Sequence, residues 1–461
     1  MQLTRLYVKN FGPIKEANIE LGDLTIITGA QNSGKSYLAT LIYALIYSYS
    51  SNALFLLDNL LQNLLQKILG FLFETEVFNL FSNINDVNEV IKKIEDNERM
   101  IVDLFNRSKY SEDIDKALID RLARLLGLDA RDVIRQGSTN MIINADYDKD
   151  YRQEYQIKKG KKDVISRLYI NNTNIIKYII SVAHDIARKK DINIIKYIIS
   201  VAYDIARKKD IKSELRIVVD SLFYFMLSDV KLPSVIYIPV ERIFILTGLT
   251  HIINITLQYL QTLKPDLVPK STLLSYLQAL NLSLLRERIK NETHKTGSIS
   301  YPIPSLGDLV IEYYEDSSIR ISFYDKKRDV KIPLQASATG IAQLAGMIIP
   351  IERLSSDFIV IEEPEVNLHA DMHIVVADYL ADKVAEGKKI VITTHSEYLL
   401  ARLAQLYAKG KIKDMKAYYI DRDNKVRKLE IDREKGEIEL PEGIRDAIDT
   451  LAKDALKLIK V

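Results

Sequence analysis

Residues 29–36 form the segment of this chain whose chemistry is easiest to predict. They read GAQNSGKS and match the phosphate-binding pattern G-x-x-x-x-G-K-[ST] at every fixed position. In such a loop backbone N–H groups surround the β-phosphate, Lys35 reaches the β- and γ-phosphates, and Ser36 ligates Mg²⁺. We therefore expect ATP to be bound by the loop residues Gly29, Ala30, Gln31, Asn32, Ser33, Gly34, Lys35 and Ser36.

A second segment supplies the carboxylates that such a loop needs. Phe358–Ile361 is an apolar run typical of a buried strand, and Glu362 and Glu363 follow it directly. Carboxylates at the end of a buried strand are costly unless they meet a cation or take part in chemistry. We expect Glu362 to hold Mg²⁺ or its water ligand, and Glu363 to orient and deprotonate the attacking water. The alternative is a pair of solvated strand-end carboxylates.

A third segment, VITTHS at 391–396, again ends an apolar strand in polar groups. His395 follows Glu363 by about 32 residues, with a helix and a strand between them, so we expect it to contact the γ-phosphate or hold the catalytic water. A structural histidine is the alternative.

The segment LQASATGIAQL at 334–344 is a turn of small residues before an apolar helix. Its Ser337, Thr339 and Gly340 offer hydroxyl and N–H groups at a helix N-terminus, which is an anion site or simply a capped helix.

The surrounding elements place these segments at strand ends. Residues 1–28 read as strands around the turn Asn10–Pro13, and Leu24–Thr28 leads straight into the glycine-rich loop, which a helix from Ser36 to about Tyr49 follows. Ser234–Arg242 includes a core strand that ends at Pro239. Antiparallel strands are predicted at 309–314, 319–324 and 330–334, a helix at about 370–386, a strand at 389–393, a hairpin at 418–431 and a last helix at 444–460.

The stretch from about 51 to 230 differs from the rest, because apolar residues recur there at helical spacing and turn signals are few. It contains a tandem repeat of 19 residues, 174–192 and 193–211, whose copies differ only at His184 and Tyr203. We read the repeat as a duplication in a loosely constrained insertion, with DNA-facing or dimer-facing RKKD ends as the alternative.

Charge is distributed unevenly along the chain. The net charge is only +2, yet residues 151–212 carry 15 Lys and Arg against 6 Asp and Glu. This basic segment predicts a DNA contact, or else a solvated helix surface. The absence of cysteine excludes disulfides, thiol chemistry and zinc–cysteine sites. No run of 18 uncharged apolar residues predicts a membrane span, so we expect a cytoplasmic protein.

Together these features predict an α/β fold. We expect a P-loop head with a mixed central sheet flanked by helices, plus an antiparallel sheet, built from residues 1–50 and 231–461. Residues 51–230 would form a mainly helical insertion.

The motifs also resemble a known family. The order of glycine-rich loop, small-residue turn, double glutamate and strand-end histidine is similar to ATP-binding-cassette heads. NFGPI (10–14), SATG (337–340), IEEPEVNLH (361–369) and TTHS (393–396) look like the ATPase region of the overcoming-lysogenisation-defect class, which is related to RecF and structural-maintenance-of-chromosomes (SMC) heads. The resemblance covers about 1–50 and 232–435.

The resemblance implies a homodimer or higher homo-oligomer with heads arranged head-to-tail around two ATP molecules. The 337–340 turn of one subunit would cap the γ-phosphate bound by Lys35 of the other, and Asn367, Leu368 and His369 would couple the two sites. Ala338 occupies the usual serine position of the turn, which leaves Thr339 or Ser337 to substitute.

Many members of the class end in a Toprim nuclease domain, but only 66 residues follow His395. We therefore read Asp421 and Asp423 as part of a hairpin turn, and expect a separate effector protein such as a nuclease or toxin. Phage defence and DNA maintenance are both implied. A non-hydrolysing ATP-dependent scaffold and a DNA-binding repair protein are the alternatives.

Overall fold

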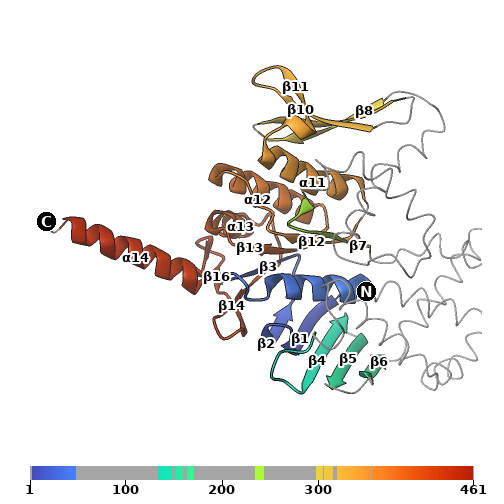
Figure 1. The fold of residues 1–461 in the computed structure, drawn as a ribbon, viewed down its shortest axis with the longest axis vertical. Coiled ribbons are helices and arrows are strands. Elements are labelled where there is room, and N and C mark those ends of the chain that lie inside the picture. Colours follow the sequence, from blue (N-terminus) through green and yellow to red (C-terminus); the bar gives the residue numbers. More distant parts are fainter. Residues whose placement is uncertain are drawn as a thin grey trace, which may run out of the picture.

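The computed structural model describes residues 3–47, 133–147, 151–158, 164–170, 234–242, 297–304, 306–314, 319–354 and 356–459. Its centre is a six-stranded sheet with the order β15-β14-β3-β13-β12-β7 (Figure 1). The strands of this sheet are β3 (Leu24–Gly29), β7 (Val235–Ile238), β12 (Phe358–Glu362), β13 (Lys389–Thr394), β14 (Met415–Ile420) and β15 (Val426–Lys428). Only β15 runs antiparallel to its neighbour, so five carboxyl ends meet at one edge.

The central sheet is buried on both faces, which explains its uninterrupted apolar strands. In β12, Ile359 and Ile361 join one hydrophobic cluster while Phe358 and Val360 join another. The first cluster lies between the sheet and the helices α11 (Thr339–Arg353), α12 (Ala370–Ala385) and α13 (Glu397–Ala408). The second includes the helix at 35–47 that follows the glycine-rich loop. The mixed sheet flanked by helices is therefore confirmed.

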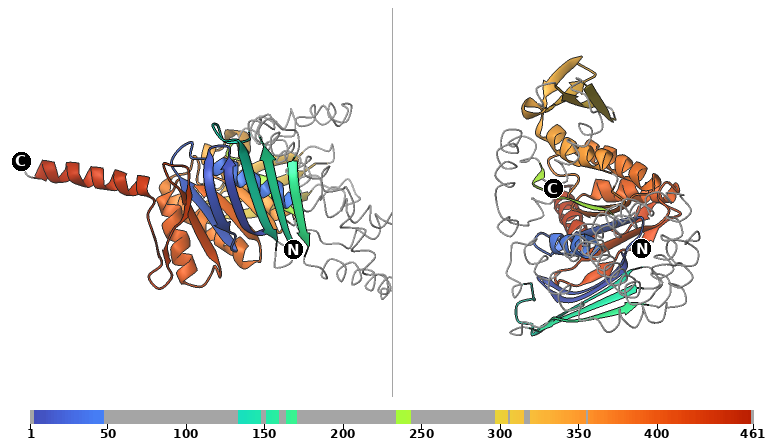
Figure 2. Two further views of the ribbon diagram at one scale, coloured as in Figure 1. Left: turned by 90° about the horizontal axis from the view of Figure 1, so that it is seen from below. Right: turned by 90° about the vertical axis from the view of Figure 1, so that its right-hand side faces the viewer.

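A five-stranded antiparallel sheet covers the second cluster, in the order β2-β1-β4-β5-β6 (Figure 2). Its strands are β1 (Leu3–Phe11), β2 (Ile14–Glu20), β4 (Asn140–Tyr147), β5 (Tyr151–Lys158) and β6 (Val164–Ile170).

The prediction that residues 51–230 are mainly helical is wrong for 140–170. Met141, Ile143, Ala145 and Tyr147 alternate with more exposed residues and bury one face of β4, while β4 pairs along β1. Strands β4–β6 therefore belong to a sheet of the head and interrupt the insertion predicted for 51–230. The tandem repeat at 174–211 lies outside the described residues, as does most of the basic segment beyond β5 and β6.

A four-stranded antiparallel sheet lies beyond α11 at one end of the molecule (Figure 1). It comprises β8 (Gly297–Ile303), β9 (Gly307–Tyr313), β10 (Ile319–Asp325) and β11 (Val330–Pro333). The short 3-10 helix η2 (Leu334–Ala336) joins it to α11. The strands predicted at 309–314, 319–324 and 330–334 are confirmed, and β8 adds one that was not predicted.

The C-terminal part completes the head and then leaves it. The two-stranded sheet β16 (Ile431–Asp432) and β17 (Glu437–Ile438) follows the β14–β15 hairpin. Helix α14 (Glu442–Ile459) then projects away from the body (Figures 1 and 2). No helix in the described part of the chain is long and apolar enough to cross a membrane.

Candidate nucleotide-binding and hydrolysis site

The parallel register of the central sheet brings the predicted site residues to one edge. Thr394 of β13 pairs with Thr28 of β3, and Glu362 of β12 pairs with Thr393. The glycine-rich loop, the double glutamate and His395 therefore follow neighbouring strands at the same edge, where ligands of open α/β sheets bind.

The backbone conformation of the glycine-rich loop favours the residues found there. Gly34 has φ +104°, and a Cβ there would lie 2.6 Å from Ile14 Cδ1 and 2.7 Å from Pro13 Cγ. Asn32 adopts φ 60°, which asparagine tolerates better than most residues. On the other side, Asn424 Nδ2 donates to the Ser33 carbonyl at 3.2 Å. The loop is thus held between the turn after β1 and the β14–β15 hairpin.

Two polar groups of the loop are poised for an anion. The hydroxyl of Ser33 is buried and has no hydrogen-bond partner among the described residues. The ammonium of Lys35 is buried too, and donates to the carbonyls of Gly29 at 3.2 Å and Ala30 at 2.9 Å. Burial lowers the pKa of Lys35, while the charges of Glu363, Glu365 and Glu362 oppose that shift. A phosphate would satisfy the hydroxyl and the ammonium together.

Glu362 is the buried member of the double glutamate, with 7% of its surface exposed. Desolvation raises the pKa of Glu362, and the hydroxyls of Ser36 and Tyr237 counter this only in part. Its Oε1 has no hydrogen-bond partner among the described residues. Ser36 itself is exposed beside the carboxylate. A carboxylate oxygen without a partner next to a serine hydroxyl is a suitable donor pair for Mg²⁺, which keeps water and phosphate as its other ligands.

Glu363 adopts a strained backbone conformation. Its φ is 40°, in the left-handed region that costs a non-glycine residue about 1–3 kcal/mol. Its side chain lies beside His395, whose Nε2 is 3.6 Å from Glu363 Oε1. Both side chains are about one-third exposed, so they line an open surface rather than the core. Burial lowers the pKa of His395, helped by the charge of Lys35 and opposed by that of Glu365.

Glu365 is a site residue that the sequence analysis missed. It is 8% exposed and accepts hydrogen bonds from Thr394 Oγ1 at 2.7 Å and from the His395 N–H at 2.8 Å. It thereby joins the loop after β12 to the end of β13 and fixes the position of the His395 backbone. A third carboxylate two positions after Glu363 was the available signal.

His373 and Ser396 make a second tie between the same elements. Ser396 Oγ accepts the Leu399 N–H at 3.0 Å, which caps α13, and lies 2.7 Å from His373 Nδ1. Because the Leu368 carbonyl, 3.3 Å from His373 Nε2, can only accept, Nε2 donates to it; in the neutral imidazole Nδ1 then accepts from the Ser396 hydroxyl. The loop at 367–369 is thus held by α12, next to the start of α13.

Arg242, which lies four residues after the end of β7, was missed as well. Its side chain is fully buried and reaches the backbone carbonyls of Glu362 and Glu363. A charged residue just beyond an apolar strand was the signal, but the neighbour of that strand cannot be read from sequence.

Among the described residues, no hydrogen bond joins the turn at 337–340 to the glycine-rich loop of the same chain. Ser337 Oγ donates to the Pro333 carbonyl at 3.1 Å, and Ala338 begins α11 without a side-chain cap. A Cβ on Gly340 would lie 3.0 Å from Leu368 Cδ2 and 3.2 Å from the Asn367 carbonyl. The turn therefore packs on the loop at 367–369, and glycine permits that close approach.

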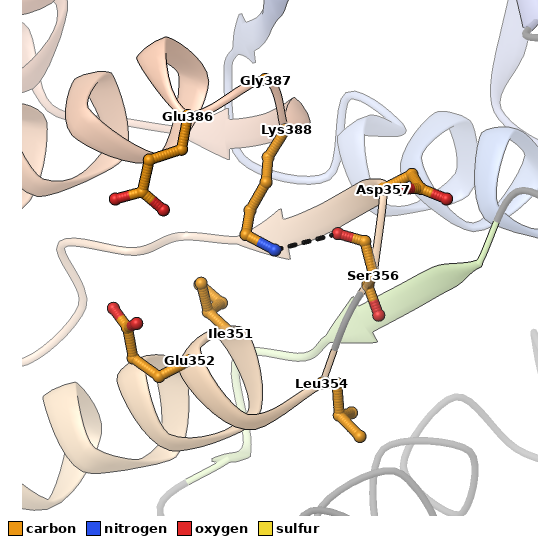
Figure 3. A pocket seen from close by; sticks show the side chains of 8 residues that line it. All are labelled: Ile351, Glu352, Leu354, Ser356, Asp357, Glu386, Gly387 and Lys388. Carbon is orange, nitrogen blue, oxygen red and sulfur yellow. Dashed lines mark hydrogen bonds between the residues drawn. The ribbon is translucent and has the colours of Figure 1, made fainter.

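A cavity of about 350 Å³ lies elsewhere, before β12 and β13 rather than after them (Figure 3). Lys388 Nζ donates to the Ser356 carbonyl across it at 3.1 Å. Its lining residues are Ile351, Glu352, Leu354, Ser356, Asp357, Glu386, Gly387 and Lys388. Because this cavity lies at the opposite edge of the sheet from the glycine-rich loop, it is no part of the candidate nucleotide site.

The fold and the site together define a P-loop nucleotide-binding protein of the α/β class. The family model described as AAA ATPase domain matches residues 1–400, so the chain belongs to this family. No curated protein matches the sequence.

Among solved structures, the SMC head domain from Thermotoga maritima is similar at 10% identity and a TM-score of 0.37, covering 94% of this chain and 100% of that one. An SMC head bound to the C-terminal winged-helix domain of ScpA gives 11% and 0.38, covering 95% and 100%. A further SMC head with an extended coiled coil, in a complex derived from Pyrococcus furiosus, gives 10% and 0.34, covering 98% and 99%.

Proposed function

We propose that this protein binds ATP with Mg²⁺ and hydrolyses it to ADP and phosphate. The observation that supports this best is the assembly at one sheet edge of Lys35, Glu362, Glu363 and His395, from three separate strand ends. An anion-binding loop and a metal-binding carboxylate define a nucleotide site, and an exposed carboxylate beside a histidine adds the means to activate water.

The site residues take separate roles in this proposal. The loop amides, the Ser33 hydroxyl and Lys35 bind the phosphates. Ser36 and Glu362 hold Mg²⁺, which neutralises charge on the transferred phosphoryl group when bound. The orphaned Oε1 of Glu362 supports this fit.

Glu363 orients the water and accepts its proton, because its exposed carboxylate stands on a rigid strand end. His395 holds the same water or a γ-phosphate oxygen. Its lowered pKa keeps the imidazole neutral at pH 7, so its free nitrogen can accept or donate a hydrogen bond.

A head-to-tail homodimer or higher homo-oligomer completes the proposed site. The uncapped amino end of α11 leaves backbone N–H groups open to a γ-phosphate of the other subunit. Thr339 is the hydroxyl that remains, since Ser337 already donates within its own turn. The packing of Gly340 on Leu368 would pass contact at the turn to the loop at 367–369.

The test combines turnover and oligomeric state. Phosphate release measured with Mg²⁺ should be lost in Lys35→Ala, and Glu363→Gln should bind ATP, release phosphate at least about 100-fold more slowly and accumulate as an ATP-bound dimer in light scattering. Lys409→Ala is a matched control, because Lys409 ends α13 away from this sheet edge. Unchanged turnover and dimer content in Glu363→Gln would overturn the assignment.

A non-hydrolysing ATP-dependent scaffold is the second candidate. It is favoured by the turn at 337–340, where Ala338 has no hydroxyl and that of Ser337 is engaged. Steady-state phosphate release that disappears in Lys35→Ala would exclude it.

Beyond ATP, we propose that the head belongs to the overcoming-lysogenisation-defect class and switches an effector protein or a DNA contact, in phage defence or DNA maintenance. The basic segment 151–212 supports the DNA contact. Binding to duplex DNA should then fall steeply with salt, and deletion of 174–211 should weaken it. Affinity that is insensitive to salt would count against a role in DNA binding.

A further inference from the structure

Arg242 is a fully buried cation that donates hydrogen bonds to backbone carbonyls of several segments. Nη1 donates to the Glu362 carbonyl at 2.8 Å and to that of Pro239 at 3.1 Å. Nη2 donates to the Glu363 carbonyl at 2.9 Å, with Pro364 at 3.4 Å. The side chain has 0% exposure. Burying a guanidinium is costly unless its donors are satisfied, so the burial must be offset by what these bonds hold in place.

The bonds hold the segment where the backbone is strained. Strand β12 ends at Glu362, so the carbonyls that follow have no strand to pair with. Glu363 has φ 40° and donates its own N–H to the Thr393 carbonyl at 3.0 Å. Arg242 holds the carbonyl of the same residue, so this peptide is fixed from both directions. Strained conformations persist only where the surroundings over-determine them.

The same guanidinium reaches a third element. Its Nε donates to the Gln343 carbonyl, at 3.4 Å, in the second turn of α11. Helix α11 begins at the turn 337–340, whose Gly340 contacts Leu368. Arg242 therefore joins the end of β7, the double glutamate and the helix that carries the turn.

We propose that Arg242 is a positioning residue for ATP hydrolysis, which holds Glu363 in its water-activating orientation and links that orientation to α11. The inference rests on the proposed function, because it concerns the same site. Lysine cannot replace arginine here, since one ammonium cannot reach carbonyls on three elements as a planar fork of five N–H donors does. A merely structural arginine would affect folding and all functions alike.

The first test separates turnover from ATP binding. Arg242→Lys should lower kcat about 100-fold, as expected for a catalytic group displaced by about 1 Å, while the Kd of ATP stays within about threefold. Arg402→Lys is the matched control. Arg402 is also a bonded arginine, paired with Asp378 at 2.9 Å, but this pair lies away from Glu362 and Glu363. A kcat within about twofold of the wild type, or equal losses of kcat and ATP affinity, would overturn the inference.

The second test needs no turnover. Hydrogen exchange of the ligand-free protein should accelerate at least about tenfold in peptides covering 362–368 in Arg242→Lys, but not in Arg402→Lys. If Arg242→Lys fails to fold, Arg242→Gln serves instead, because a neutral amide leaves no buried charge. Unchanged exchange in a folded variant would overturn the inference. If exchange accelerates in Arg242→Lys as expected but the wild type releases no phosphate, the proposed function is overturned instead.

Discussion

Glu362→Gln should make the ligand-free protein more stable and its response to Mg²⁺ and ATP weaker. Glu362 is nearly fully buried, and its Oε1 has no partner in the described part of the chain. A site for a cation needs this buried, only partly compensated carboxylate, while the ligand-free fold does not. Glutamine has the same shape without the charge, so it removes the cost of desolvation and the metal ligand together.

The magnitude follows from the burial. An unsatisfied buried polar group costs about 1–3 kcal/mol, and removing only the charge should recover about 1 kcal/mol. For 461 residues the unfolding entropy is about 1 kcal/mol per kelvin, so Tm should rise by about 1 °C. ATP at 100 times its Kd should stabilise the wild type by about 2.7 kcal/mol, or about 3 °C. Loss of a metal ligand weakens binding about 10- to 100-fold, which reduces that gain to about 1.4 kcal/mol or less.

The assay is thermal unfolding of both proteins with and without Mg²⁺ and ATP, repeated at several pH values. The folded-state pKa of Glu362 is raised, so its protonated form is favoured by folding, and the stability that this gives is lost as pH rises from about 4.5 through the folded pKa. The advantage of Glu362→Gln should therefore be largest at neutral pH and vanish toward pH 4.5. A variant that is less stable than the wild type at pH 7 without ligand, or that gains as much from Mg²⁺ and ATP, would refute the reasoning.

Three further predictions concern the loop, the histidine and the missed carboxylate. Gly34→Ala should weaken ATP binding about tenfold or more in a fluorescence titration, because its Cβ would lie under 3 Å from Pro13 and Ile14 at φ +104°; normal affinity would contradict the geometry. His395→Gln should lower kcat about 10- to 100-fold and remove the fall in activity that protonation of His395 causes below pH 6.5, as checked by pH–rate profiles of both proteins. Glu365→Ala should lower the free energy of unfolding by about 2 kcal/mol by leaving the buried Thr394 hydroxyl and the partly buried His395 N–H unpaired, and Glu365→Gln should cost much less in denaturant titrations.

Much of the site could be predicted because it follows buried parallel strands. Leu24–Gly29, Phe358–Glu362 and Lys389–Thr394 are buried along almost their whole length, so each mostly apolar run and its polar end are visible in the sequence. Parallel strands then bring those ends together without any knowledge of sheet order.

The contributions of Arg242 and of β4 could not be predicted in the same way. Arg242 matters because β7 pairs with β12, a neighbour about 120 residues away, and sheet order is set by packing between distant segments. The alternation in 140–147 was a readable strand signal, but it lies within a long lysine- and asparagine-rich stretch of helical spacing. The helical spacing averaged over about 180 residues hides the alternation of the eight residues in β4.

The left-handed backbone of Glu363 had no signal in the sequence. It connects a residue that could be predicted, Glu363, with one that could not, Arg242. The strain there costs about 1–3 kcal/mol, so it requires contacts that a solvated strand end would not need. Arg242 holds its carbonyl, and Thr393 of β13 accepts its N–H. A pair of carboxylates that was merely exposed to water would relax to an ordinary conformation. Because this backbone is instead held by a buried cation, the structure argues against the alternative of two solvated strand-end glutamates.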